Sequence, residues 1–359
     1  MWKRATCIFV LTLAPLWTAE ARNKEDSKVL LPPDLLLQDG RKLTYELAFG
    51  TEKAVIGKPG FWGKVLNVIA GEPDYRELIR PYGIAVDSHG RAIITDPGAR
   101  GVHIFDFEQH KYKFVQRADR EHDAMLAPQC VAVDAEDNFY VTDSESGKIF
   151  VFEAGGKFKH VLGSLKGGEG YFKRPTGIAV DSAAQRIYVT DTLRDKIFVL
   201  DMQGQVMKTI GQHGTGKDDF YYPTELRLDD HGAGGQSLMV VDAMNFRVQL
   251  VGPDGAFEGT IGQIGDSAGS LFRPKGIGID SEGHLYVVEG LSGLVQVFDR
   301  EGHLLYYFGG RGQALGQFQL PAGLFIDGHD RIYVVDSFNR RVQVFHYYGL
   351  AKQARGGTP

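Results

Sequence analysis

Pro175-Thr-Gly-Ile-Ala-Val-Asp181 opens a unit of four short apolar runs, which continues with Arg186-Ile-Tyr-Val-Thr-Asp191, Lys196-Ile-Phe-Val-Leu200 and Gly204-Gln-Val-Met-Lys-Thr-Ile-Gly211. Each run is rich in β-branched or aromatic residues, has the length of a strand and is bounded by Gly, Asp or Ser. No long window shows helical spacing of apolar residues. The unit is therefore predicted to form four antiparallel strands, which we call a to d.

The same unit occurs six times, about every 47 residues. Its prolines are Pro81, Pro128, Pro175, Pro223, Pro274 and Pro321, and the acids that close strand a are Asp87, Asp134, Asp181, Asp229, Asp280 and Asp327. One such unit cannot bury its own apolar faces, so the units must pack on one another. The sequence predicts an all-β, six-bladed β-propeller of four-stranded antiparallel blades, a ring that leaves only short strand edges exposed.

The last unit lacks its fourth strand, because the chain ends soon after Val342-Gln-Val-Phe345. Gly63-Lys-Val-Leu-Asn-Val-Ile-Ala-Gly71 matches the pattern of strand d. We therefore expect an N-terminal strand, Val65 to Ile69, to close the last blade beside Val342 to Phe345. Leu43-Thr-Tyr-Glu-Leu-Ala-Phe49 is another strand-like run, either a further edge strand or an arm across the ring.

The motif Pro-x-Gly-Ile-x-Val-Asp, followed by Ile-Tyr-Val-x-Asp and Asn-x-Arg-Val-Gln-Val-Phe, resembles the NHL repeat over residues 63–346. Its third part is clearest at Asn245 and Arg247 and again at Asn339 and Arg341. The resemblance implies the six-bladed fold. It implies much less about function, since similar propellers act as docking rings, RNA-binding surfaces, receptor parts and, less often, lyases or lactonases.

The N-terminus has the pattern of an export signal. Met1 to Arg4 is basic, Ala5 to Trp17 is almost wholly apolar, and Ala19-Glu-Ala21 offers small residues for cleavage. We expect a signal peptide at 1–21, an arm at 22–62, the propeller at 63–346 and a tail at 347–359. The short signal is of bacterial type, so the expected location is periplasmic or extracellular.

Export would leave no membrane span, because the apolar run is too short for an anchor and no second one follows. Cleavage would remove Cys7 and leave Cys130 alone, so no internal disulfide is expected. It would also change the formal net charge from -5 to -6. A mildly acidic product is not expected to bind nucleic acid, where phosphate neutralisation dominates affinity.

Several recurring side chains are predicted to serve the scaffold. An acid ends strand b in every unit and is expected to accept backbone N–H bonds in the turn that follows. An apolar residue three positions before each proline is expected to plug the gap between blades, with an aromatic ligand platform as the alternative. Cys130 takes a position that is Gly in four other units, which favours tight packing over a reactive thiol.

Binding residues are expected at positions that depart from the pattern shared by the six units. Blade 4 has Glu225 and Arg227 on its innermost strand, where they either form an internal ion pair or meet a ligand near the channel. Lys275 and Tyr82 follow their prolines and are expected at the same mouth. Neighbouring tyrosines complete the candidate set: Tyr221 and Tyr222.

The predicted function is a non-catalytic, monomeric binding or scaffold module for a partner protein or an envelope polymer such as a polysaccharide. Binding is expected on the face made by the d to a loops and the b to c turns. No catalytic residue, metal or cofactor is predicted. The alternative is a metal-dependent lyase or lactonase at the channel mouth, which would need zinc or calcium; only His122 and His213 lie in loops of that face.

Overall fold

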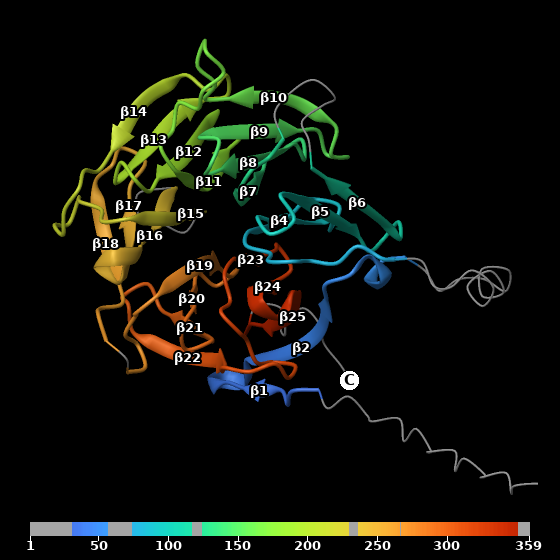
Figure 1. The fold of residues 1–359 in the computed structure, drawn as a ribbon. Coiled ribbons are helices and arrows are strands. Elements are labelled where there is room, and N and C mark those ends of the chain that lie inside the picture. Colours follow the sequence, from blue (N-terminus) through green and yellow to red (C-terminus); the bar gives the residue numbers. More distant parts are fainter. Residues whose placement is uncertain (1–30, 57–73, 117–123, 230–235, 266, 351–359) are drawn as a thin grey trace, which may run out of the picture. The chain divides into compact units, whose positions relative to one another are not determined.

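The computed structural model describes residues 31–56, 74–116, 124–229, 236–265 and 267–350. The described residues belong to one compact unit, and its strands form six sheets that surround a central axis (Figure 1). Five sheets have four antiparallel strands and the sixth has five. Among the described residues, no helix is long and apolar enough to cross a bilayer.

The strands follow the repeat in sequence order. Blade 1 contains β3 (Ile84–Val86), β4 (Ala92–Asp96), β5 (Gly101–Asp106) and β6 (Lys111–Val115); blade 2 contains β7 (Pro128–Val133), β8 (Phe139–Asp143), β9 (Lys148–Phe152) and β10 (Phe158–Leu162); blade 3 contains β11 (Pro175–Asp181), β12 (Arg186–Asp191), β13 (Lys196–Asp201) and β14 (Val206–Ile210). Blade 4 contains β15 (Pro223–Asp229), β16 (Ser237–Asp242), β17 (Arg247–Val251) and β18 (Phe257–Ile261); blade 5 contains β19 (Pro274–Ile279), β20 (Leu285–Glu289), β21 (Leu294–Phe298) and β22 (Leu304–Gly309).

Blade 6 contains β23 (Leu324–Ile326), β24 (Arg331–Asp336), β25 (Arg341–Tyr348), β2 (Lys42–Phe49) and β1 (Leu35–Leu36). Short 3-10 turns lie at η1 (Gln38–Gly40), η2 (Glu52–Ala54), η3 (Ala243–Asn245) and η4 (Ser337–Asn339). The a strands β3, β7, β11, β15, β19 and β23 contact one another in that order around the axis, and β23 contacts β3. This arrangement confirms the predicted six-bladed propeller.

The core consists of six apolar clusters, each between two neighbouring blades. Val151 of blade 2 packs with Val189 of blade 3, and Val335 of blade 6 packs with Ile94 of blade 1. Each blade thus buries its faces against its neighbours, as the repeat pattern requires. The six residues three positions before each proline are all buried, so they are core plugs and do not form a ligand platform: Leu78, Met125, Phe172, Phe220, Leu271 and Phe318.

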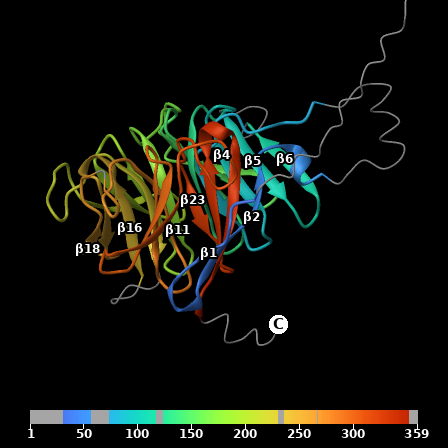
Figure 2. The same cartoon turned by 90° about the horizontal axis from the view of Figure 1, so that it is seen from below.

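An N-terminal strand closes the ring, but it is not the segment expected. β2 pairs antiparallel with β25, with Phe49 opposite Val342 and Tyr45 opposite Phe345 (Figures 1 and 2). Gly63–Gly71 lies outside the described residues, and β2 occupies the place beside Val342–Phe345 that was predicted for it. β1 then adds a fifth strand outside β2. The sheet therefore starts upstream of residue 63, the predicted start of the propeller.

Charged contacts hold β2 in this register. Its Glu46 accepts hydrogen bonds from Arg331 Nε at 3.0 Å and from His346 Nδ1 at 2.9 Å. These partners lie on β24 and β25 of the same blade. The side chains of Leu43 and Phe49 are buried, whereas Leu47 is 40% exposed. The closing strand is thus fixed both by its apolar face and by its polar one.

Glu282, in the a to b turn of blade 5, links both ends of the described chain to the ring. Its carboxylate accepts hydrogen bonds from Arg41 Nε (3.0 Å), Tyr347 Oη (3.0 Å) and the Leu350 backbone N–H (2.7 Å). Burial acts to raise the pKa of Glu282, but the bonds from these three donors outweigh it and leave the pKa below its ordinary value.

We expect Glu282→Gln to flatten the loss of stability in acid. Because the folded-state pKa lies below the ordinary value of 4.5, the carboxylate contributes stability above that value and loses it as the pH falls through the folded pKa. The contribution should be about 1–2 kcal/mol, since the group is partly exposed. Urea unfolding at pH 7 and pH 3 measures it. Equal acid sensitivity of the two proteins would contradict this assignment.

Candidate binding site at the channel mouth

The acids that end strand b organise the loop face. Each accepts backbone N–H bonds from the loop preceding strand a of its own blade: Asp96, Asp143, Asp191, Asp242, Glu289 and Asp336. Asp143 also accepts the N–H groups of Glu145 and Ser146 in the b to c turn. Their predicted structural role is confirmed, and they fix the d to a loops as well.

The consensus Asn and Arg side chains of the b to c turns act on the same acids. Asn245 Nδ2 donates to Asp242 at 2.8 Å, and Arg247 Nε donates to it at 2.9 Å. Asn339 and Arg341 repeat these bonds to Asp336 at 2.8 and 2.7 Å. The same contacts are therefore present in both blades.

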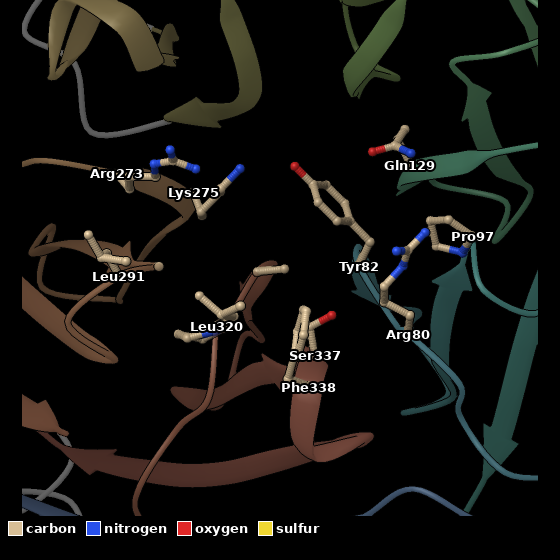
Figure 3. A pocket seen from close by; sticks show the side chains of 13 residues that line it. Arg80, Tyr82, Pro97, Gln129, Arg273, Lys275, Leu291, Leu320, Ser337 and Phe338 are labelled. Atoms are coloured by element: carbon tan, nitrogen blue, oxygen red, sulfur yellow. The ribbon is translucent and has the colours of Figure 1, made fainter. Parts of the chain in front are cut away.

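A pocket of about 350 Å³ opens at the channel mouth and is lined by blades 5, 6 and 1 and by Gln129 of blade 2; we call it the mouth pocket (Figure 3). Two of the predicted site residues, Tyr82 and Lys275, line it. The remaining lining residues are Arg80, Pro97, Gln129, Arg273, Gly290, Leu291, Leu320, Pro321, Ala322, Ser337 and Phe338. The walls thus combine cations with apolar surface.

The polar residues of the mouth pocket sit on well-determined backbone. Arg80 and Arg273 each precede a repeat proline, which restricts their backbone to extended conformations. The backbone N–H of Arg80 donates to Asp96 at 3.0 Å, and that of Arg273 donates to Glu289. Asp96 and Glu289 thus accept backbone N–H bonds, while the side chains of Arg80 and Arg273 are exposed.

Lys275 and Tyr82 both point toward the centre of the channel (Figure 3). Lys275 Nζ lies 6.0 Å from the centroid of the Tyr82 ring. Burial lowers the pKa of Lys275, and the charges of Arg273 and Arg174 lower it further, while Glu225 opposes them. Burial also raises the pKa of the Tyr82 hydroxyl, so this group is a neutral donor at physiological pH.

Glu225 and Arg227 form an ion pair, with Arg227 Nη2 2.7 Å from Glu225 Oε1. Arg227 Nη2 also donates to the carbonyl of Leu324 at 3.2 Å and to that of Ile84 at 3.4 Å. These carbonyls belong to blades 6 and 1, so Arg227 reaches across the channel from blade 4. Burial raises the pKa of Glu225, and the charge of Arg227 opposes that rise.

The pair does not line the mouth pocket. Arg227 instead lines a second cavity of about 330 Å³, which is bounded by strand a residues of blades 1 to 4 and by Phe325. Of the two interpretations of this pair, the internal ion pair describes what the structure contains. A ligand contact through Glu225 or Arg227 stays a prediction.

Cys130 lies next to this pair. Its Sγ is 3.8 Å from Arg227 Nη1 and 4.0 Å from Glu225 Oε1. Burial and the charge of Glu225 raise the pKa of the thiol to about 11. The thiol is therefore protonated at neutral pH and is a packing group, in line with its predicted role.

The two adjacent tyrosines have different surroundings. Tyr221 is 39% exposed, and its ring stands edge-on to His213 at a centroid distance of 5.0 Å. Tyr222 Oη accepts a hydrogen bond from Arg174 Nη1 at 3.1 Å. Neither tyrosine lines the mouth pocket.

Sequence reasoning missed most of the mouth pocket, above all Arg80 and Arg273. A signal was present: the residue before the repeat proline is Arg in blades 1, 3 and 5, at Arg80, Arg174 and Arg273, and is uncharged in the other three. Leu320 and Phe338 carried no comparable signal. They were missed because only the folded ring brings their loops beside blade 1.

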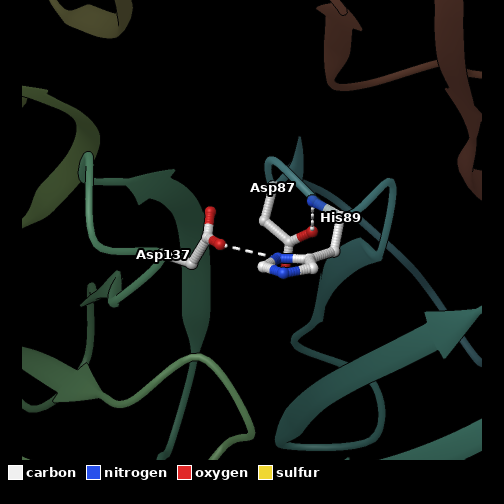
Figure 4. Close-up of side chains that lie close together, drawn as sticks. All are labelled: Asp87, His89 and Asp137. Atoms are coloured by element: carbon white, nitrogen blue, oxygen red, sulfur yellow. Dashed lines mark hydrogen bonds and ion pairs between the residues drawn. The ribbon is translucent and has the colours of Figure 1, made fainter.

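One possible metal-binding group lies in the a to b turns at the opposite end of the blades. Ligand atoms of Asp87, His89 and Asp137 lie within 4.8 Å of one another (Figure 4). Asp137 accepts bonds from the Ser88 N–H (2.9 Å), the Ser88 hydroxyl (2.7 Å) and His89 Nδ1 (2.8 Å). Ser281 makes the same two bonds to Asp330 between blades 5 and 6. The group is therefore best explained as a set of hydrogen bonds that joins the a to b turns of neighbouring blades.

The histidines of the described residues lie away from the lining of the mouth pocket. His213, exposed on the loop face, pairs with Asp195 at 3.0 Å. His284 pairs with Asp280 at 2.8 Å at the opposite end. His122 lies outside the described residues. Within the described part of the chain, the lining of the mouth pocket includes no histidine or carboxylate side chain.

Comparison with known proteins supports the fold. An NHL repeat model matches residues 126–152, and a family described as a 6-bladed beta-propeller matches residues 179–248. No curated protein sequence matches significantly. The fold and the repeat together define a six-bladed β-propeller with NHL-type repeats.

Many solved structures are similar to this fold, and three of them illustrate the likeness. A structural genomics protein of unknown function from Bacteroides thetaiotaomicron has a TM-score of 0.59 at 16% identity, covering 88% of this chain and 84% of its own. An auxiliary nutrient binding protein from the same organism has a TM-score of 0.56 at 13% identity, covering 76% and 70%. Virginiamycin B lyase from Staphylococcus aureus has a TM-score of 0.53 at 16% identity, covering 74% and 94%. At these identities, the likeness concerns the fold alone.

Proposed function

We propose that this protein is an exported, monomeric, non-catalytic binding module of bacterial type. It captures a partner protein or an envelope polymer through the loop face, which consists of the d to a loops and the b to c turns. Export rests on the pattern of residues 1–21, which lie outside the described residues. The binding role rests on the surface chemistry of the loop face.

The observation that carries the proposal is the uneven distribution of exposed apolar side chains. The loop face exposes Ile79, Leu165, Leu193, Tyr221, Met244, Ile264, Phe272, Leu291, Leu320 and Phe338. At the other face, the described residues of the a to b and c to d turns expose no large apolar side chain, and Leu350, which follows β25 and donates to Glu282 there, is 41% exposed. Apolar surface gathered on one face and mixed with charges is typical of a docking surface.

The test is partner capture by matched variants. The intact protein is immobilised and exposed to an envelope extract, and retained proteins and polysaccharides are measured. Leu193→Ser, Met244→Ser and Phe272→Ser together should lower retention roughly tenfold or more, because exposed apolar anchors carry much of the energy of an interface. The control, Val206→Ser, Met207→Ser and Leu305→Ser, changes exposed side chains on outer strands and should retain the partner. Equal retention by all three proteins would contradict the proposal.

The competing function is a metal-dependent lyase or lactonase at the channel mouth. The likeness to virginiamycin B lyase concerns the fold, and the nutrient binding protein shares that fold equally well. The described lining of the mouth pocket offers lysine and arginine rather than the carboxylates and imidazoles that hold zinc or calcium. Metal analysis of the purified protein tests this: stoichiometric zinc or calcium would favour the enzyme.

A further inference from the structure

We propose that the mouth pocket is a receptor for an oxyanion carried by the ligand, held where Lys275, Arg273 and Arg80 face one cavity without acidic neighbours in its lining. The inference deepens the proposed binding function and rests on it. Carboxylate, sulfate and phosphate groups share the required chemistry: a negative charge on several hydrogen-bond acceptors.

The first support is unused charge. Among the described residues, the side chains of Lys275, Arg273 and Arg80 form no hydrogen bond or ion pair. The nearest acids are already committed: Glu225 pairs with Arg227, and Glu289 accepts backbone N–H bonds from Phe272 and Arg273. The positive charge at the mouth is therefore available to a ligand.

The second support is the cost of leaving Lys275 uncompensated. A partly buried ammonium beside other cations is unfavourable, and its lowered pKa reflects this. The charged groups that act on it are Arg273, Arg174, Glu225 and Glu289. A bound oxyanion would add an opposite charge and raise the pKa of Lys275, so binding would stabilise the charged ammonium.

The third support is preorganisation. Arg80 and Arg273 are fixed at their backbone by Asp96 and Glu289 and by the prolines that follow, so less ordering is needed on binding. The Tyr82 hydroxyl and the Gln129 amide supply neutral donors, and Leu320 and Phe338 supply an apolar wall. The volume of about 350 Å³ lies at the small end of ligand pockets and suits a unit of monosaccharide size.

Calorimetric titration with four probes tests the inference: glucuronate, glucose 6-sulfate, glucose 6-phosphate and glucose. At least one acidic sugar should bind, and glucose should not. Comparison of the three acids identifies the preferred oxyanion. Lys275→Gln should weaken binding about tenfold or more, because a charged partner is lost. Lys159→Gln, the same change on the exposed outer strand of blade 2, should leave affinity unchanged. Affinity should also fall as the pH rises through the lowered pKa of Lys275.

Three results would overturn the inference: no acidic sugar binds, glucose binds as tightly, or Lys275→Gln binds as the parent does while keeping its unfolding temperature. Arg273→Gln provides a second variant if Lys275→Gln fails to fold. Loss of this inference alone would leave capture by the loop face intact and still sensitive to the Leu193, Met244 and Phe272 substitutions. Failure of the proposed docking surface would leave sugar binding intact.

Discussion

Phe49→Ala is expected to lower the free energy of unfolding by about 3–5 kcal/mol, the cost of removing a buried aromatic ring from a packed core. Phe49 is 4% exposed on the closing strand β2, and its ring stands edge-on to Phe105 at 5.1 Å and to Phe107 at 5.0 Å. Both rings belong to blade 1, so this contact joins the last blade to the first. Denaturant unfolding followed by far-UV circular dichroism measures the loss.

Leu47→Ala is the matched control, because Leu47 lies on the same strand but is 40% exposed. It should change stability by less than about 1 kcal/mol. The outcome that contradicts the closure seen here is a silent Phe49→Ala together with a costly Val65→Ala, which would return the closing role to Gly63–Gly71.

The scaffold was predictable because the same residue pattern recurs in all six units and predicts the same four strands in each. The acid before each b to c turn, such as Asp143, occurs at one position in every unit, and a role common to all blades is structural. The same logic identified Phe172 and its counterparts as core residues. The periodicity therefore predicted both the number of blades and the structural role of the positions that recur in every repeat.

The closing strand could not be chosen from the pattern alone. Leu43–Phe49 and Gly63–Gly71 both read as strands, and only one can lie beside β25. The choice depends on contacts far away in the sequence: Glu46 with Arg331 and His346, and Phe49 with Phe105. Strand propensity contains no information about such partners.

The candidate site was predictable only in part for a similar reason. Lys275 and Tyr82 stood out as departures from the repeat beside the channel, and both line the mouth pocket. Glu225 and Arg227 were equally clear departures from the repeat, yet they form an ion pair with each other and do not line the mouth pocket. A break in a repeat thus marks a special environment without telling whether a ligand or a second side chain fills it.

Arg227→Met is expected to lower the free energy of unfolding by about 3–5 kcal/mol, because it leaves the Glu225 carboxylate buried without its partner. Glu225 is 4% exposed. The substitution also removes the donors to the carbonyls of Ile84 and Leu324, which belong to blades 1 and 6. Denaturant unfolding at pH 7 is the measurement.

The double variant Glu225→Gln with Arg227→Met separates the two causes. It removes both charges at similar volume, so most of the lost stability should return if the unpaired carboxylate is the main cost. If the loss came instead from the two carbonyls, the double variant would stay as unstable as the single one. A third pattern, normal stability of Arg227→Met with weakened capture of the partner, would mean that Arg227 serves the ligand and that the ion pair is not what holds this part of the channel together.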